Sequence, residues 1–387
     1  MAGTTTNPTG KRRFRRLLFG LMVLVYALLF GEFFLRLLAP QPLVSRYVTG
    51  GADGVRANIP GISFRQWTPE VDVTIRYNRA GQRDDRPPPG TRTPGDCRIA
   101  LLGDSYFVGF ESSFENSFAN RLEQAFDRRG HPCRVVNFAV SGFGDAENLR
   151  ILESRVRPFH PDLLLLSVHQ TDGLDNVRAN LFRIDQGRLS GTGNSYLPGV
   201  EISDRLNRYR LYRWAQENSH LYSAVREWAG ATGKRLLAKL RLADADTADS
   251  SPDENPIGTD ASGLPTWVGD QALNATLVEA IGREGQTFGA RLLLFEIPTY
   301  NKGRYIGIID RLLPAALLAQ IPHASPLQRF RAMSPAGGPL YLTRGQRHWT
   351  ARGNEVAAEV AADSILESGL LPPMAAQPTD QQADQPE

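Results

Sequence analysis

Four short polar segments carry the residue types that could do chemistry, and each adjoins an apolar run or a helical pattern. Ser105 follows the apolar run "RIALLGD", and Ser141-Gly142 follows "VVNFAV". His169 follows "DLLLLSV", and His348 precedes "WTARGNEVAAEVA". A serine hydroxyl becomes a nucleophile when an imidazole takes its proton, so Ser105 and His348 are the candidate nucleophile and general base. The competing interpretation is a serine that only caps the turn after its strand.

The elements that must bring these segments together alternate in type along the chain. Apolar runs predict buried strands, and each is followed by a stretch of helical periodicity. This alternation predicts an α/β fold with a parallel sheet and helices on both faces. Ligands gather at the carboxyl ends of such strands, where we expect the polar segments to meet. The predicted strands are 98–103, 134–140, 162–168 and 290–297, and the predicted helices are about 116–129, 146–157, 270–284 and 353–366.

The residue types and their order resemble the SGNH, or GDSL-type, hydrolase superfamily over about residues 98–368. "GDSY" resembles the first block, whose serine is the nucleophile, here Ser105. "SGFG" resembles the second block, whose glycine N–H stabilises an oxyanion, here Gly142. "QTDGLDN" falls at the third block, and "RHWTARGNEVAAE" resembles the last, with the catalytic histidine at His348. The resemblance implies the SGNH hydrolase fold, a flavodoxin-like three-layer sandwich, and serine-esterase chemistry.

Two positions depart from the pattern of the superfamily. The third-block asparagine, an oxyanion donor, is replaced by Thr171, whose shorter hydroxyl we expect to donate instead; losing such a donor costs ~10²–10³ in rate. The aspartate that precedes the catalytic histidine is replaced by Gly345 and Gln346. We therefore expect either a dyad, in which Gln346 or a carbonyl orients His348, or a loss of chemistry, because an amide at this place costs ~10⁴ in a serine triad.

Three further residues adjoin the expected pocket. We interpret Asp104 as a structural hydrogen-bonding residue of the turn. His169 and Asp172 form a candidate pocket pair in which His169 binds substrate, or else they are polar residues at a strand end. Because no two His or Cys have metal-ligand spacing and no glycine-rich phosphate loop follows the first strand, we expect neither a metal nor a nucleotide cofactor.

The N-terminal segment predicts a membrane anchor. Residues 1–16 end in a basic cluster, and the apolar segment 17–38 is long enough as a helix, at ~33 Å, to cross a bilayer. Basic residues favour the cytoplasmic side, so the rest of the chain would lie outside the cytoplasmic membrane. Glu32 and Arg36, four residues apart, can pair on one helix face. A cleaved signal peptide and a buried core helix are the alternatives, but no small-x-small cleavage site is evident.

Outside the cytoplasm, the two cysteines could form a stable disulfide. Cys97 and Cys133 each stand one residue before a predicted strand, so parallel neighbouring strands would bring their thiols together at one sheet edge. A disulfide there would stabilise the fold by ~3–4 kcal/mol on the chain-entropy model. The alternative is two separate buried thiols.

The remaining segments complete the predicted domain organisation. Residues 39–95 form a connector with some β structure, and 96–371 form the hydrolase-like domain, interrupted by an insertion at about 178–265. That insertion contains a hairpin, a helical stretch and a polar loop. The tail 372–387 has a composition typical of disorder. With 44 Lys and Arg against 41 Asp and Glu and no basic stripe among aromatics, the chain does not resemble a nucleic-acid binder.

The layout is also similar to membrane-anchored bacterial SGNH proteins, with an asparagine–glycine–arginine turn at Asn78, Gly81 and Arg83. This resemblance implies an esterase or O-acyltransferase of the cytoplasmic membrane, facing the periplasm. Its substrate would be an acylated carbohydrate, commonly an acetylated envelope or exported polysaccharide, and its partners the machinery of that polysaccharide. The alternative is a catalytically degenerate domain that binds a glycan or a membrane partner.

Overall fold

A five-stranded parallel sheet forms the centre of the protein in this computed structural model, which describes residues 8–195, 198–245, 270–301, 303–333, 337–344 and 347–372. The strands lie in the order β14-β11-β8-β6-β7, which is the doubly wound, flavodoxin-like order with β6 counted as the first strand. The predicted α/β fold class is therefore confirmed. The bounds are β6 (Arg98–Leu102), β7 (Arg134–Asn137), β8 (Leu163–Val168), β11 (Arg291–Glu296) and β14 (His323–Ala324).

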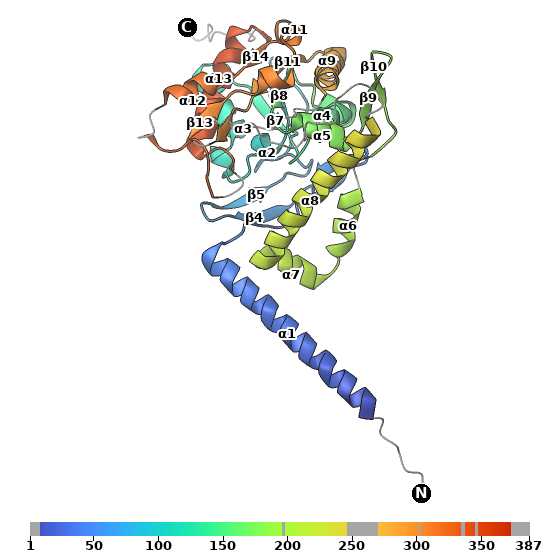
Figure 1. The fold of residues 1–387 in the computed structure, drawn as a ribbon. Helices are drawn as coiled ribbons and strands as arrows, with labels where there is room; N and C mark the ends of the chain where they lie inside the picture. Colours follow the sequence, from blue (N-terminus) through green and yellow to red (C-terminus); the bar gives the residue numbers. More distant parts are fainter. Residues whose placement is uncertain are drawn as a thin grey trace, which may run out of the picture.

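Helices cover both faces of the sheet, and alternate residues of each strand define the two sides. Leu163 and Leu165 of β8 join the core that contains α3 and α13, whereas Leu164 and Leu166 join the core that contains α4 and α9. Figure 1 shows these pairs of helices on opposite sides of the sheet, with α5 beside α4. The bounds are α3 (Phe118–Arg128), α4 (Asp145–Ile151), α5 (Asp172–Ala179), α9 (Gln271–Thr287) and α13 (Ala351–Glu367).

The predicted connector packs against the sheet domain through an antiparallel sheet of order β1-β4-β5. Phe64, Ile75 and Tyr77 of this segment are buried in the same core as Ile99 of β6. A small β2–β3 ribbon completes the segment. The bounds are β1 (Leu43–Val44), β2 (Val48–Gly50), β3 (Arg56–Asn58), β4 (Ser63–Trp67) and β5 (Asp72–Arg76).

The predicted insertion contains a hairpin followed by three helices. Its polar loop and the disordered tail predicted from residue 372 lie almost wholly outside the described residues. The bounds are β9 (Phe182–Asp185), β10 (Arg188–Gly191), α6 (Pro198–Leu206), α7 (Arg210–Asn218) and α8 (His220–Ala245).

Several short elements connect the larger ones. The predicted helix 146–157 is α4 continued by a π-helical turn at Leu152–Val156 and a 3-10 turn at Arg157–Phe159 that contains Pro158. The other short elements are α2 (Ser105–Val108), a 3-10 turn at Phe114–Asn116, β12 (Thr299–Asn301), β13 (Arg304–Ile306), α10 (Ile309–Leu312), α11 (Ala315–Leu318) and α12 (Leu327–Ala332).

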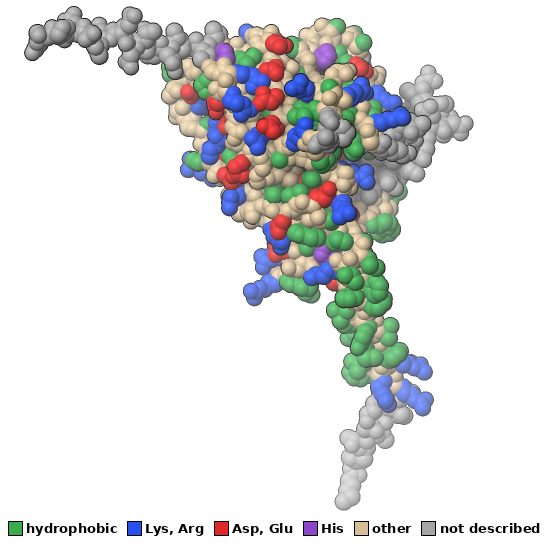
Figure 2. Space-filling model, turned by 90° about the vertical axis from the view of Figure 1, so that its left-hand side faces the viewer, with side chains coloured by type: hydrophobic (Ala, Val, Ile, Leu, Met, Phe, Trp, Pro, Cys, Tyr) green, Lys and Arg blue, Asp and Glu red, His purple; other side chains and the backbone are tan. Residues whose placement is uncertain are grey.

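Helix α1 (Pro8–Leu38) projects from the rest of the protein (Figure 1). An 18-residue window within Arg12–Leu38 has a mean hydropathy of 2.2, and none of its residues is buried. Figure 2 shows hydrophobic side chains along the helix and basic ones towards its free end. The helix is long and apolar enough to cross a membrane. A signal sequence near the N-terminus can have the same length and composition.

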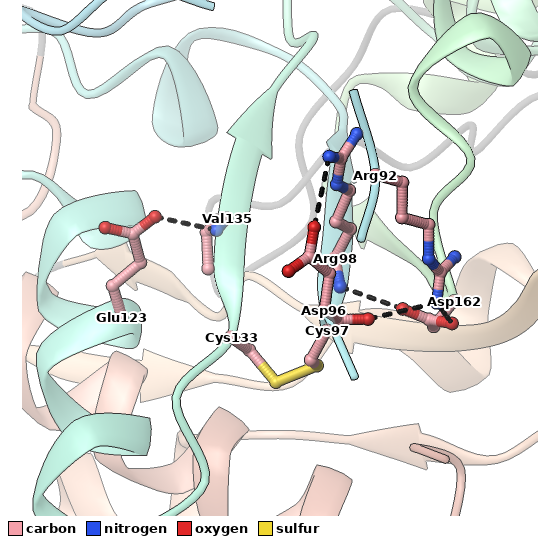
Figure 3. The surroundings of a disulfide bond; sticks show 8 residues. All are labelled: Arg92, Asp96, Cys97, Arg98, Glu123, Cys133, Val135 and Asp162. Atoms are coloured by element: carbon pink, nitrogen blue, oxygen red, sulfur yellow. Dashed lines mark hydrogen bonds and ion pairs between the residues drawn. A yellow bond between two sulfur atoms is a disulfide. The ribbon is translucent and has the colours of Figure 1, made fainter. Parts of the chain in front are cut away.

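The structure joins Cys97 and Cys133 by a disulfide at the amino ends of β6 and β7 (Figure 3). The register of the two parallel strands explains this pairing, because Arg98 lies opposite Arg134. Asp162 accepts the backbone N–H of Arg98 at 2.8 Å and so ties this end of β6 to the start of β8.

Candidate active site

Ser105 lies on a tight corner at the carboxyl end of β6. Gly103 is required there, because a Cβ atom at this position would collide with the hydroxyl of Ser167 on β8. Asp104 then caps α2 by accepting the backbone N–H of Tyr106 at 2.9 Å. Ser105 is the first residue of α2, so its N–H has no partner within the helix and its side chain stands at the sheet edge.

His348 meets Ser105 although 243 positions separate them in the chain. The distance from His348 Nε2 to Ser105 Oγ is 2.8 Å, which is a hydrogen bond. The imidazole precedes α13, whose N-cap is Thr350, and an isolated bridge between Tyr341 and Trp349 fixes the chain before the helix. Both partners come from the residues that the sequence pattern singled out.

The other ring nitrogen of His348 has a carboxylate partner. Nδ1 of His348 lies 2.9 Å from Oε2 of Glu111, and the Glu111 side chain is fully buried. The same oxygen also accepts the backbone N–H of His348 at 3.3 Å. We expected Gln346 or a carbonyl to hold His348, and the structure corrects this: the described partner of Nδ1 is the Glu111 carboxylate. Gln346, predicted as the orienting residue, lies outside the described residues.

The loop of Glu111 and Ser112 is held by contacts from three other segments. The backbone of Glu111 has a φ of 61°, in the left-handed region, and its N–H donates to Oε1 of Gln66 on β4 at 2.9 Å. The next residue, Ser112, is held through its carbonyl by the buried Arg83 at 2.9 Å and through its hydroxyl by Asn354 of α13 at 2.9 Å. This loop is therefore fixed by both the connector and the last helix.

Tyr106 makes aromatic contacts with both His169, which follows β8, and His348, which precedes α13. Its ring centroid lies 5.0 Å from that of His169 and 5.0 Å from that of His348. Its hydroxyl donates to the carbonyl of Arg347 at 3.1 Å, just before the catalytic candidate. Burial, with Asp104 and Glu111 nearby, raises the pKa of Tyr106 above its usual range, so the phenol stays protonated.

His169 pairs with Asp104 next to the corner. Nδ1 of His169 lies 2.9 Å from Oδ2 of Asp104 and 3.2 Å from the hydroxyl of Thr171. Burial alone would raise the pKa of Asp104, but its interactions with His169 and the N–H of Tyr106 outweigh burial and lower it. The Thr171 hydroxyl, which we expected to donate to an oxyanion, thus interacts with the His169 ring.

Asp172 is buried and contacts the backbone of His169. Its Oδ2 accepts the backbone N–H of His169 at 2.7 Å. Burial, together with the nearby Asp145 and Asp104, raises its pKa well above the ordinary value of an aspartate. The two residues of the expected pocket pair are therefore in contact through the His169 backbone, while the His169 ring contacts Asp104.

The loop after β7 brings Ser141 and Gly142 to the same edge. Gly142 has a φ of 74°, which favours glycine, and its carbonyl accepts a hydrogen bond from the Arg56 guanidinium of β3. Oε2 of Glu147 accepts the N–H of Gly144 at 3.0 Å where α4 begins. Both ends of this loop are therefore hydrogen-bonded to side chains of the protein.

A cleft of about 510 Å³ contains both Ser105 and His348. Most of its lining is polar, and one wall comes from the residues that directly follow α1. The lining residues are Pro40, Gln41, Pro42, Ser105, Ser141, Glu227, Arg344 and His348.

Comparisons with known proteins give a match among curated proteins and several among solved structures. No family model matches the chain. A curated arylesterase of Vibrio mimicus is 30% identical over 77 residues, which are 20% of this chain and 38% of that protein, so the match spans well under half the relative's length. Among solved structures, the lipase/acylhydrolase of Enterococcus faecalis is 13% identical, with 72% and 100% of the two chains covered and a TM-score of 0.34. A GDSL-like lipase of Bacteroides thetaiotaomicron is 11% identical, with 70% and 88% covered and a TM-score of 0.33.

Proposed function

We propose that this protein is an SGNH-type serine esterase in which Ser105, His348 and Glu111 form a catalytic triad. One observation carries the proposal: the continuous contact from the Ser105 hydroxyl through both ring nitrogens of His348 to the buried Glu111 carboxylate, at 2.8 and 2.9 Å. Nucleophile, base and orienting acid in hydrogen-bond contact are the signature of acyl transfer through serine, whatever their order in the chain.

The triad would act in two half-reactions. Oγ of Ser105 attacks the ester carbonyl while its proton passes to Nε2 of His348, and Glu111 stabilises the imidazolium that forms. The backbone N–H groups of Ser105 and Gly142 are our candidate donors to the oxyanion. Collapse of the tetrahedral intermediate expels the alcohol, which takes the proton from His348. A water or sugar hydroxyl, deprotonated by the same imidazole, then releases the acyl group from Ser105.

The lining of the cleft favours a small acyl group on a polar carrier. Gln41, Ser141, Glu227 and Arg344 offer hydrogen bonds and charge, whereas an acyl chain of lipid length needs an apolar channel. We therefore propose an acetyl or similarly short ester of a carbohydrate as the substrate. The alternative is a catalytically degenerate binding domain, suggested by Gln346 and Thr171. The contact between His348 and the Glu111 carboxylate argues against it.

We further propose that α1 is a retained membrane anchor with its basic end in the cytoplasm. Helix α1 is bound to the rest of the protein by a specific contact, in which the Glu32 carboxylate accepts the N–H of Leu221 at 2.9 Å where α8 begins. If α1 were removed as a signal peptide, the first N–H groups of α8, those of His220 and Leu221, would lose Glu32 as their acceptor. The active-site domain would then lie outside the cytoplasmic membrane, where the Cys97–Cys133 disulfide is stable.

Ester hydrolysis by the full-length protein in detergent tests the catalytic proposal. We expect release of p-nitrophenol from p-nitrophenyl acetate, faster than from the longer-chain laurate, and a fall of at least about 10³-fold in Ser105→Ala. Equal rates for the wild type and the variant would overturn the proposal. Adding an oligosaccharide acceptor separates the two fates of the acyl group: hydrolysis gives free acetate, and transfer gives acetylated acceptor detected by mass.

A further inference from the structure

The helical insertion presents large apolar side chains that no part of the described protein covers. Leu211 is 77% exposed and Trp228 is 71% exposed, which is unusual for leucine and tryptophan on a soluble surface. We define the apolar surface of the insertion as Ile202, Tyr209, Leu211, Trp214, Val225 and Trp228, which belong to α6–α8 and the link before α7.

This insertion is fixed to α1 by polar contacts at the turn between α7 and α8. The carboxylate of Glu32 accepts the backbone N–H groups of His220 at 3.1 Å and Leu221 at 2.9 Å. Arg36 donates to the carbonyl of Asn218, at the end of α7, at 2.6 Å. Gly31 lies against Leu221, because a Cβ atom there would be 3.7 Å from the leucine side chain. The beginning of α8 therefore lies beside Gly31 and Glu32.

The position of this contact along α1 sets the depth of the insertion. Gly31 lies seven residues before the end of α1 at Leu38, a distance of ~10 Å along the helix. A hydrocarbon core of ~30 Å takes about 20 residues, so a core that begins at Leu17 ends near Arg36. The turn between α7 and α8 would then lie at or just below the membrane–water boundary. Figure 1 shows α7 beside the upper part of α1, in agreement with this depth.

The residues around the apolar surface suit a lipid interface better than a second protein. Tyr209, Trp214 and Trp228 are amphipathic aromatics of the kind enriched at headgroup level. Arg208, Arg210 and Arg213 are exposed beside them and can interact with lipid phosphates. Figure 2 shows hydrophobic and basic side chains together at the base of the globular part, where α1 joins it.

We propose that α6–α8 lie in the outer interface of the bilayer that α1 crosses, with the apolar surface of the insertion among the lipid headgroups and upper acyl chains. The inference rests on the proposed anchor. Two contacts, α1 across the membrane and the insertion along it, would fix the orientation of the whole domain. Because Pro40 and Pro42 follow α1 and Glu227 belongs to α8, the cleft of Ser105 would open beside the membrane surface.

Spin labels on the full-length protein in vesicles of neutral and anionic phospholipid test this inference. The native cysteines are bonded, so single cysteines can be labelled at Leu211→Cys and Trp228→Cys in the insertion, at Leu24→Cys in α1, and at Gln320→Cys on the far end of the protein. Collision rates with oxygen, which partitions into lipid, and with a water-soluble nickel chelate report the depth of each label. We expect the oxygen-to-nickel ratio at Leu211→Cys and Trp228→Cys to exceed that at Gln320→Cys several-fold.

The other outcomes overturn the inference in distinguishable ways. A high ratio at Leu24→Cys with a low, Gln320-like ratio at both insertion sites would leave the anchor intact and refute interfacial docking. Slow collisions with both reagents at the insertion sites would show that a second copy covers the surface instead. A low ratio at Leu24→Cys would refute the anchor itself and, with it, the docking.

Discussion

Glu111, the proposed orienting acid, belongs to the loop that follows Ser105. His348 and Ser105 could be recognised from the sequence, because each stands at the boundary of a strongly patterned element. Glu111 could not, since six residues after Ser105 it lies in an irregular segment and reaches the imidazole through a left-handed backbone conformation. The residues directly before His348 give no sign of this carboxylate, because the fold brings it from another loop.

Glu111→Gln should lower kcat for p-nitrophenyl acetate by about 10³–10⁴-fold. The amide keeps the size of the side chain but cannot stabilise an imidazolium, and it favours the wrong tautomer of His348. Steady-state kinetics on purified protein measure the change, and Glu111→Asp is the matched control that keeps the charge. An undiminished kcat in Glu111→Gln would show that Glu111 has no part in the reaction.

Gln346→Asp offers a second test at the same ring. Nδ1 of His348 already interacts with Glu111, and Nε2 interacts with Ser105. A new carboxylate at position 346 would therefore find no free ring nitrogen. We expect the variant to hydrolyse p-nitrophenyl acetate at a rate close to that of the wild type. A large gain in kcat would mean that Glu111 does not act as the acid in solution.

At the scale of elements, the antiparallel sheet of the connector takes part in building the site. Gln66 on β4 accepts the N–H of Glu111, and Arg83 holds the next carbonyl. Both residues come from the segment that the sequence analysis treated as a connector. Its weak alternation predicted strands, but no local pattern could show that two of its polar residues point into the hydrolase-like domain.

Gln66→Leu should lower kcat by about 10- to 100-fold, because small displacements of a catalytic group are costly. The neighbouring Arg65→Leu is the matched control, since Arg65 lies on the opposite side of the same strand and pairs with Asp72 at the surface. Kinetics with p-nitrophenyl acetate distinguish the two. Similar losses of kcat in both variants would indicate general damage to β4. An unchanged kcat in both would show that Gln66 does not help to position Glu111.

The central strands could be predicted because they are contiguous apolar runs, and β6, β8 and β11 lie within one residue of their predicted bounds. Segment 298–333 could not be predicted, because its strands and helices are only two to six residues long and are formed by tertiary contacts. For example, β14 pairs with β11 through only two residues, which give no periodic signal.

The disulfide between β6 and β7 should contribute ~3–4 kcal/mol to the free energy of unfolding on the chain-entropy model, since it closes a loop of 36 residues. Chemical denaturation of the Cys97→Ala/Cys133→Ala double variant measures this contribution. Wild-type protein alkylated without a reductant is the control and should take up no label. An unchanged denaturation midpoint would show that the bridge adds nothing to stability.

At the scale of the whole molecule, helix α4 carries two buried acids, Asp145 and Glu147. Neither lines the cleft of Ser105. Burial, with the charge of Asp175 nearby, raises the pKa of Asp145 to about 7, against a hydrogen bond from Asn176 that lowers it. Burial likewise raises the pKa of Glu147 to about 7, although Arg56 lowers it. In the unfolded chain both groups ionise near pH 4, so the folded state holds more protons between about pH 4 and 7.

The stabilisation from a protonated Asp145 should therefore be full below about pH 4 and lost as the pH rises to about 7. Asp145→Asn keeps an acceptor for Asn176 and removes the titration. We expect the stability of the variant relative to the wild type to rise with pH in this window, by at most about 1.4 kcal/mol per pH unit. Thermal and chemical unfolding at several pH values measure it, and a constant difference between the two proteins would contradict the raised pKa.

Covalent labelling of the full-length protein with a fluorophosphonate probe tests the triad most directly, because only an activated serine reacts rapidly with it. Mass spectrometry of proteolytic peptides locates the adduct. The triad predicts a single adduct on Ser105, absent in Ser105→Ala and formed much more slowly in Glu111→Gln. A wild-type protein that stays unlabelled, or an adduct that persists on another serine in Ser105→Ala, would contradict it.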